Sequence, residues 1–247
     1  MLNKPHFLDK EAEQINFLDQ RFYKVEDEYY PSITFILQYY PKDQHFLDWL
    51  KQHGNNSDYI VRKAADEGTQ THYLIEKYLK GEEIEWLNQD GDVKYPFIVW
   101  DMLLKFDEFW KTLNPKLIHS EVILYSKTHK IGGSCDLVLE IEDKLWVIDI
   151  KTSKNLHKSY DLQTAAYSTC YEEMFNKKVD YAGILWLKSS KRKLNKEKKQ
   201  GKGWELYQSP QNIEKNWSYF EKVYDLFKLE NPNIEPKFTQ YPLKIKI

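Results

Sequence analysis

Cysteine, glycine and proline are scarce in this sequence: among 247 residues there are 2 cysteines, 9 glycines and 9 prolines. Cys135 and Cys170 are too few for a disulfide framework or for a four-cysteine iron–sulfur cluster. No apolar stretch approaches the roughly 20 residues that cross a bilayer. Residues 1–21 are rich in charge and lack the apolar core of a signal peptide. We therefore expect a soluble, intracellular protein without a membrane partner.

Aromatic residues are abundant, at 15% of the chain, which is typical of a folded protein rather than a disordered one. The length fits one large domain, or one domain with a helical addition. The net charge of -2 does not by itself indicate a nucleic-acid partner. Its distribution is uneven, because residues 188–202 hold eight basic residues against one acid and so carry +7, which leaves -9 for the rest.

The periodicity of the apolar residues predicts an α/β fold with a helical N-terminal region. Helical spacing covers much of the first third, with Ser32 and Ser57 as candidate caps. The expected helices there are residues 33–39, 46–53, 57–80 and 95–113. Alternating or β-branched runs then predict strands at residues 117–125, 133–141, 145–152, 181–187 and 204–208, with helices at 156–175 and 209–229. We expect a central mixed β-sheet flanked by helices, with a helical region at residues 1–115 and a core at 116–247 in one compact unit.

Three ionisable residues interrupt apolar strands in the middle of the chain. Asp136 follows a pair of glycines that would let another backbone or a ligand approach closely. Asp149 and Lys151 are two residues apart on one strand, so their side chains share a face. A tight polar connection at residues 142–144 predicts a hairpin that brings Asp136 beside them. Burying these charges is costly unless something compensates them, which indicates a site.

The chemistry of phosphodiester hydrolysis suits this arrangement. It needs a nucleophilic water, a Lewis acid on the phosphate and help for the leaving oxygen. Asp136 and Asp149 would bind Mg²⁺ or Mn²⁺, with the Ile150 carbonyl as a further ligand. Lys151 would orient the water and offset the charge that develops on the phosphate. The simpler interpretation is an ordinary Asp–Lys pair at a strand end, because short motifs recur by chance.

The context of these residues resembles a known family. An acid, a hairpin and the sequence Asp-Ile-Lys at residues 149–151 resemble the core of the PD-(D/E)XK nucleases, although Cys135 stands at the family's proline position. Gln163 and Tyr167 match the Gln-x-x-x-Tyr motif of the RecB-like branch, and their spacing puts them on one helical face. The resemblance implies a restriction-endonuclease-like core in which both side chains support the motif lysine and touch the substrate. A packed amphipathic helix is the alternative interpretation.

Two more elements of that branch lie upstream. The sequence Gly-Thr-Gln-Thr-His at residues 68–72 resembles its helical metal-binding element, so the resemblance implies that His72 is a ligand and that Thr69 contacts nucleic acid. Glu121 corresponds to an early strand acid that reaches the metal. A solvated or core histidine and an exposed acid are the alternatives. The sequence Pro-Ser-Ile-Thr at residues 31–34 resembles the start of the group that includes the mitochondrial genome maintenance exonuclease and many phage nucleases.

These residues predict a Mg²⁺- or Mn²⁺-dependent nuclease that hydrolyses DNA, with no iron–sulfur cluster. We expect an exonuclease on single strands or ends, active in DNA repair or recombination, in the cytoplasm of a bacterium or a phage-infected cell. Lys191, Arg192 and Lys193 would contact phosphates, and a solvated loop is the alternative. The rival interpretation is a non-catalytic module of nuclease fold that binds DNA or protein. A helicase or replication partner is possible, but the sequence has no phosphate-binding loop of its own.

Overall fold

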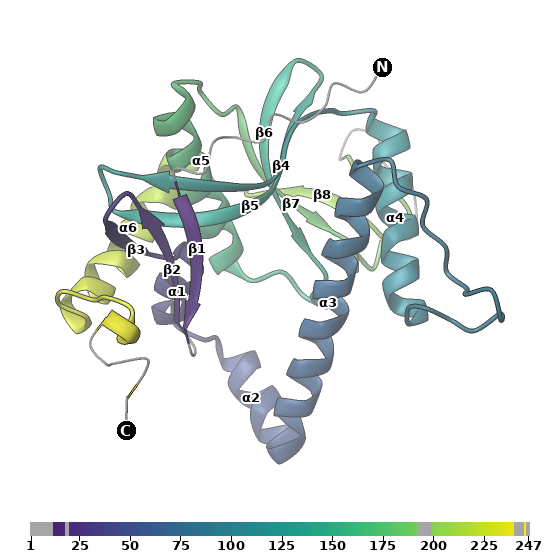
Figure 1. Cartoon of the computed structure of the whole chain (residues 1–247), viewed down its shortest axis with the longest axis horizontal. Helices are drawn as coiled ribbons and strands as arrows, with labels where there is room; N and C mark the ends of the chain where they lie inside the picture. Colours follow the sequence, from purple (N-terminus) through teal and green to yellow (C-terminus); the bar gives the residue numbers. More distant parts are fainter. Residues whose placement is uncertain (1–11, 18–19, 192–198, 240–244, 246–247) are drawn as a thin grey trace.

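A five-stranded mixed β-sheet forms the centre of the computed structural model, which describes residues 12–17, 20–191, 199–239 and 245 (Figure 1). Its strands lie in chain order: β4 (Lys116–Ser126), β5 (Ile131–Ile141), β6 (Lys144–Lys151), β7 (Tyr181–Trp186) and β8 (Glu205–Gln208). β6 and β7 are parallel, and the other neighbours are antiparallel. The predicted mixed sheet and all five of its strands are therefore confirmed.

Helices cover both faces of this sheet. On one face lie α1 (Ile33–Ile36), α5 (Lys158–Phe175) and α6 (Ile213–Glu230), and on the other lie α3 (Ser57–Leu79) and α4 (Phe97–Leu113). Along β6, Val147 packs toward α5 while Trp146 and Ile148 pack toward α3 and α4. Because side chains alternate along a strand, the next odd-numbered residues, 149 and 151, face α5. No helix of the described chain is both long and apolar enough to span a membrane.

The N-terminal region contains a second sheet, so the expectation of a wholly helical first third is wrong for residues 12–31. Three antiparallel strands form it: β1 (Ala12–Phe17), β2 (Gln20–Val25) and β3 (Glu28–Pro31). β2 and β3 meet at a tight turn in which Glu26 adopts a φ of 54°. Short strands of this kind depend on the packing of their side chains more than on local preference. Here Phe22, Tyr23 and Val25 are buried.

The predicted N-terminal helices are present with small shifts. Ser32 caps α1 by accepting a hydrogen bond from the Phe35 amide, and a 3₁₀ turn, η1 (Leu37–Tyr39), follows. α2 (Gln44–His53) and the turn η2 (Gly54–Asn56) lead into α3, whose N-cap is Asn56 rather than the expected Ser57. No residue of α2 is buried, and the α2–α3 hairpin projects from the body of the molecule (Figure 1).

The two glycines before Asp136 make room for side chains, not for a backbone or a ligand as expected. A Cβ at Gly132 would lie 2.8 Å from the ring of Tyr23, and one at Gly133 would lie 2.3 Å from Cε1 of Tyr167. β2 of the small sheet and α5 therefore both pack directly on the backbone of β5. Glycine is required at these positions by this close approach, which seats Tyr167 beside the strand.

We predict that Gly133→Ala destabilises the fold by about 1–3 kcal/mol, the usual cost of overpacking a core. Urea unfolding measures this cost. In a Tyr167→Leu background the added methyl group has space, so the same substitution should cost at least about 1 kcal/mol less. An equal cost in both backgrounds would show that the ring does not press on this strand.

Candidate functional site

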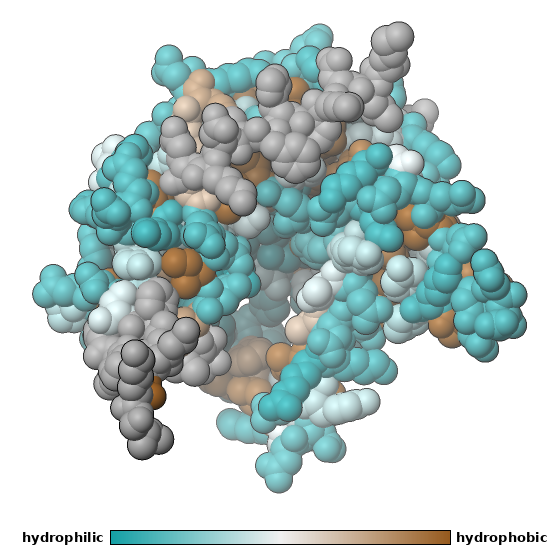
Figure 2. All heavy atoms as spheres, in the orientation of Figure 1, coloured by the Kyte–Doolittle hydropathy of each residue, from teal (hydrophilic) through white to brown (hydrophobic). Residues whose placement is uncertain are grey.

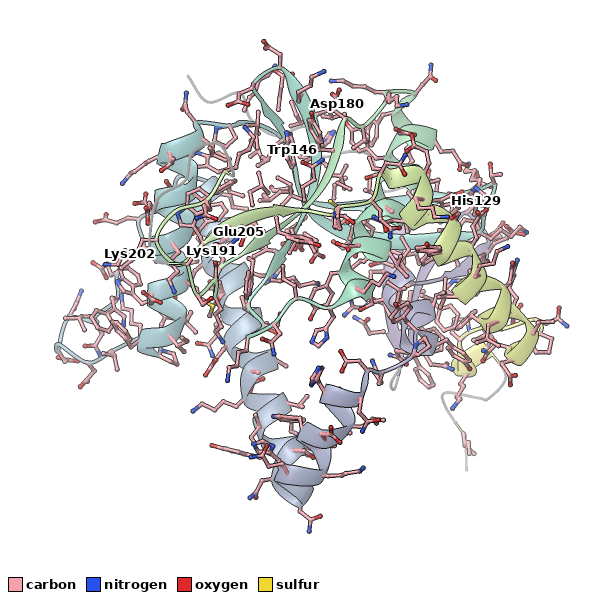
Figure 3. All side chains as sticks on the ribbon, turned by 180° about the vertical axis from the view of Figure 1, so that it is seen from behind. His129, Trp146, Asp180, Lys191, Lys202 and Glu205 are labelled. Atoms are coloured by element: carbon pink, nitrogen blue, oxygen red, sulfur yellow. The ribbon has the colours of Figure 1, made fainter. Side chains whose placement is uncertain are left out.

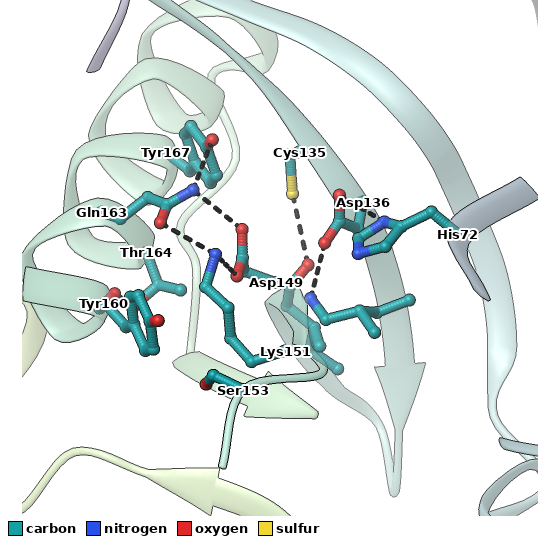
Figure 4. Close-up of polar contacts among 12 residues, drawn as sticks. His72, Cys135, Asp136, Asp149, Lys151, Ser153, Tyr160, Gln163, Thr164 and Tyr167 are labelled. Atoms are coloured by element: carbon teal, nitrogen blue, oxygen red, sulfur yellow. Dashed lines mark hydrogen bonds and ion pairs between the residues drawn. The ribbon is translucent and has the colours of Figure 1, made fainter. Parts of the chain in front are cut away.

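The candidate site lies at a fork between β5 and β6. Pairing of the two strands ends where Leu137 lies opposite Ile148; beyond that point β5 continues beside β4, and β6 continues beside β7. Buried backbone groups at such a fork need new partners. Asp136 Oδ2 accepts a hydrogen bond of 2.5 Å from the Ile150 amide (Figure 4), and Cys135 Sγ donates to the Ile148 carbonyl at 3.6 Å.

Cys135 stands at the position where the resemblance leads one to expect proline. Burial raises the pKa of its thiol well above the ordinary value, so the thiol stays protonated and can donate. The sequence analysis treated this residue only as a departure from the family pattern. In the structure its thiol is one of the groups that satisfy the backbone at the fork.

β4 has an unusual backbone where it passes Asp136. Glu121 lies between the paired residues Ser120 and Val122 and adopts a φ of 49°, the left-handed region. For a residue with a long side chain this conformation costs about 1–3 kcal/mol and persists only where the surroundings enforce it. Such outliers cluster at functional sites, and this one lies on the strand next to the fork.

Three potential metal ligands meet at this point. Ligand atoms of His72, Glu121 and Asp136 all lie within 4.8 Å of one another. His72 comes from α3, and its Nδ1 lies 3.5 Å from Asp136 Oδ1 and 3.9 Å from Glu121 Oε1. One helical turn earlier, a Cβ at Gly68 would lie 3.1 Å from Thr152 Oγ1, so α3 runs close to the end of β6. One imidazole nitrogen with carboxylate oxygens fits Mn²⁺, and the carboxylates also fit Mg²⁺.

The charges of this group compensate one another. Burial alone would lower the pKa of His72, but Asp136 and Glu121 outweigh it and raise that pKa well above its ordinary value. Burial also acts on Asp136, yet the charge of His72 holds the Asp136 pKa below its ordinary value. Burial raises the pKa of Glu121. The two carboxylates thus need a positive charge beside them, which protonated His72 provides here. A bound divalent cation would provide that charge instead, and His72 would then be neutral.

A second group of side chains surrounds Lys151 on the α5 side of the fork (Figure 4). Lys151 Nζ lies 2.6 Å from Asp149 Oδ2 and donates to Gln163 Oε1 at 3.2 Å. The amide nitrogen of Gln163 donates to Asp149 Oδ1 and to the Tyr167 hydroxyl, both at 2.8 Å. Gln163 is buried and uses both ends of its amide here, which an ordinary packed helix face does not explain.

The same group fixes the charge of Lys151. Burial alone would lower the pKa of Lys151, but Asp149 and Asp136 outweigh it and raise that pKa. Burial raises the pKa of Asp149 to about 6, against the opposing effect of Lys151. Lys151 therefore keeps its positive charge, because the neighbouring carboxylates favour its protonated form.

The structure brings the predicted residues into two adjoining groups. His72, Glu121 and Asp136 form the candidate metal-ligand group, whereas the two oxygens of Asp149, which is not part of that group, contact Gln163 and Lys151. The Ile150 backbone joins the groups through its amide, whereas the ligand role expected of its carbonyl stays a prediction.

Sequence reasoning missed one member of the lysine group. The ring of Tyr160 lies 4.6 Å from Lys151 Nζ. The signal was available, since Tyr160 precedes Gln163 by three residues and so shares its helical face.

The residues predicted to contact nucleic acid are only partly described. Thr69 lies on the exposed side of α3, and its hydroxyl donates to the Ala65 carbonyl at 3.0 Å. Lys191 forms an ion pair with Glu205 at 2.6 Å, and both residues are labelled in Figure 3. Arg192 and Lys193 lie outside the described residues. The contact of these four residues with nucleic acid stays a prediction.

Comparison with known proteins identifies a family for most of the chain. Residues 44–239 match the family model described as the PD-(D/E)XK nuclease superfamily. The matched segment begins at α2 and includes both groups of side chains at the fork. A search of curated proteins gave no significant match.

We predict that the purified protein binds Mn²⁺ in isothermal titration calorimetry and that Asp136→Asn weakens this binding by more than about 10-fold, since even outer-shell partners contribute that much. Asp161→Asn, which changes another buried carboxylate, serves as the control and should bind like the wild type. Unchanged Mn²⁺ affinity in the Asp136→Asn protein would show that the Asp136 carboxylate does not bind the metal.

Proposed function

The chain belongs to the PD-(D/E)XK nuclease superfamily, and we propose that it is a divalent-metal-dependent nuclease that hydrolyses DNA phosphodiester bonds at the β5–β6 fork. The observation that carries the proposal is the meeting of Asp136, Asp149 and Lys151 where two strands part. A module that only binds DNA has no need for a half-buried lysine beside two buried acids. Taking such charges out of water is costly even when they are paired, and clusters of this kind are typical of functional sites.

The residues present fit a divalent ion. His72, Glu121 and Asp136 would hold it, with Asp149 and the Ile150 carbonyl as further ligands. When bound, the ion supplies Lewis-acid polarisation of the phosphate and lowers the pKa of water.

Lys151 acts through its charge in this proposal. Its raised pKa keeps the ammonium group protonated, so it serves as a hydrogen-bond donor and not as a proton acceptor. A fixed ammonium group beside the phosphate stabilises the negative charge that grows during hydrolysis. Gln163 holds Lys151 and Asp149 at fixed positions through the two ends of its amide, and Tyr167 fixes Gln163 in turn.

We predict cleavage of labelled DNA in the presence of Mg²⁺ or Mn²⁺, and none with a chelator. Lys151→Ala and Asp149→Ala should each lower kcat by at least about 100-fold, the usual loss when one electrostatic contact of a transition state is removed. Lys144→Ala is the matched control, because this exposed lysine lies at the other end of β6 and pairs with Asp180. Cleavage by the Lys151→Ala protein at the wild-type rate would contradict the proposal.

The shape of the molecule supports an exonuclease that acts on single strands or ends. α3 carries His72 near its C-terminal end, while α2 and the first half of α3 project beyond the sheet (Figure 1). The surface is hollowed beside α3 (Figure 2), which provides a path for a strand past the hairpin. Thr69, Lys191, Arg192 and Lys193 are the proposed contacts with nucleic acid. A helicase or recombination protein is a proposed partner.

We predict that linear single-stranded DNA is degraded at least about 10-fold faster than a circle of the same sequence, because a path that admits one strand favours a free end. Gel analysis of both substrates under identical metal conditions measures the ratio. Equal rates on the circle and the linear strand would make the enzyme an endonuclease.

A further inference from the structure

We propose that Tyr160 is a positioning residue for Lys151 and holds the ammonium group over the face of its ring. The inference rests on the proposed function and adds a residue that the family motifs did not predict. Lys151 Nζ lies 4.6 Å from the centre of the Tyr160 ring, within the range of about 6 Å over which an aromatic face attracts a cation (Figure 4).

The start of α5 fixes the backbone that carries this ring. The Tyr160 amide donates to the His157 carbonyl at 2.9 Å, and the Tyr160 carbonyl accepts from Thr164 Oγ1 at 3.2 Å. The imidazole of His157 meets the ring edge-on at 5.4 Å. Tyr160 and Gln163 are three residues apart on the helix, so both project toward Lys151 from one face. The ring is therefore part of the same rigid element as the glutamine.

The Tyr160 ring differs from the other partners of Lys151, because it attracts the ammonium group without offering an oxygen to a metal ion. Asp149 Oδ2, at 2.6 Å, is its shortest contact, but this carboxylate is also a proposed metal ligand. An oxygen that binds a divalent ion offers less negative charge to the lysine, which leaves Gln163 Oε1 and the ring as partners. The π face attracts the ammonium group without providing an oxygen that competes for the ion. The N–H groups of Lys151 also stay available to a phosphate.

The contact itself can be tested without metal or activity. In protein labelled with ¹³C at the lysine ε carbon, the ring current of Tyr160 should shift the Lys151 ε-methylene protons upfield, and Lys151→Arg identifies the signal by its loss. Tyr160→Phe should keep the shift and Tyr160→Leu should abolish it. A Lys151 signal at the ordinary lysine position in the wild type would overturn the proposal.

Kinetics then test the role. Tyr160→Leu should lower kcat by about 3- to 30-fold at unchanged KM, the range expected for a partly desolvated cation–π contact, while Tyr160→Phe keeps the wild-type kcat. Tyr219→Leu is the matched control, because that ring also carries lysines, Lys158 at 5.2 Å and Lys215 at 5.0 Å, away from the fork. Equal losses for the Phe and Leu variants would assign the effect to the hydroxyl group and overturn the proposal.

The two tests separate this inference from the proposed function. If the Tyr160→Leu protein unfolds at the same temperature as the wild type, a loss of kcat cannot be attributed to a loss of fold. If the wild-type protein cleaves no DNA, the proposed function fails while the ring-current shift still decides whether Tyr160 holds Lys151. If the wild type cleaves DNA and the Tyr160→Leu protein does so equally well, only the positioning role is lost.

Discussion

The hydrogen bond from the Ile150 amide to Asp136 is the interaction on which the site depends. It replaces the backbone pairing that β5 and β6 lose beyond Leu137 and Ile148, and without it a buried amide would stay unpaired at a cost of about 1–3 kcal/mol. The same bond orients the carboxylate, whose other oxygen faces His72. One side chain thus both satisfies the backbone of the sheet and presents a candidate metal ligand.

Opposite charges alternate across the fork, and each is stabilised by its neighbours. His72 lies between two acids, and Lys151 contacts a third. Burial penalises these charges, and an opposite charge beside each of them offsets part of that penalty. The left-handed backbone of Glu121 adds local strain at the same place. Such a cluster of charges would destabilise an ordinary core, and it is typical of a functional site, as expected for a member of the PD-(D/E)XK nuclease superfamily.

The periodicity of the sequence predicted which side chains share a face of a strand or helix. It was less informative about which elements pack against one another. The two-residue spacing of Asp149 and Lys151 and the four-residue spacing of Gln163 and Tyr167 each placed a pair on one face, and both pairs are in contact. Local spacing does not tell which element covers a strand, so the rings packed on the glycines and the small N-terminal sheet were not predicted. Nor does it reveal where two paired strands part, which is why the fork and its Cys135 thiol became visible only in three dimensions.

In the proposed function, the fork gathers its acids around a divalent ion while Lys151 stays beside them. Anomalous diffraction at the manganese edge, from crystals grown with Mn²⁺, tests it most directly. We expect one strong peak within bonding distance of Asp136 and His72, with Asp149 turned toward the ion and Lys151 still held by Gln163. A peak elsewhere on the surface, or none at the fork at saturating Mn²⁺, would contradict the account.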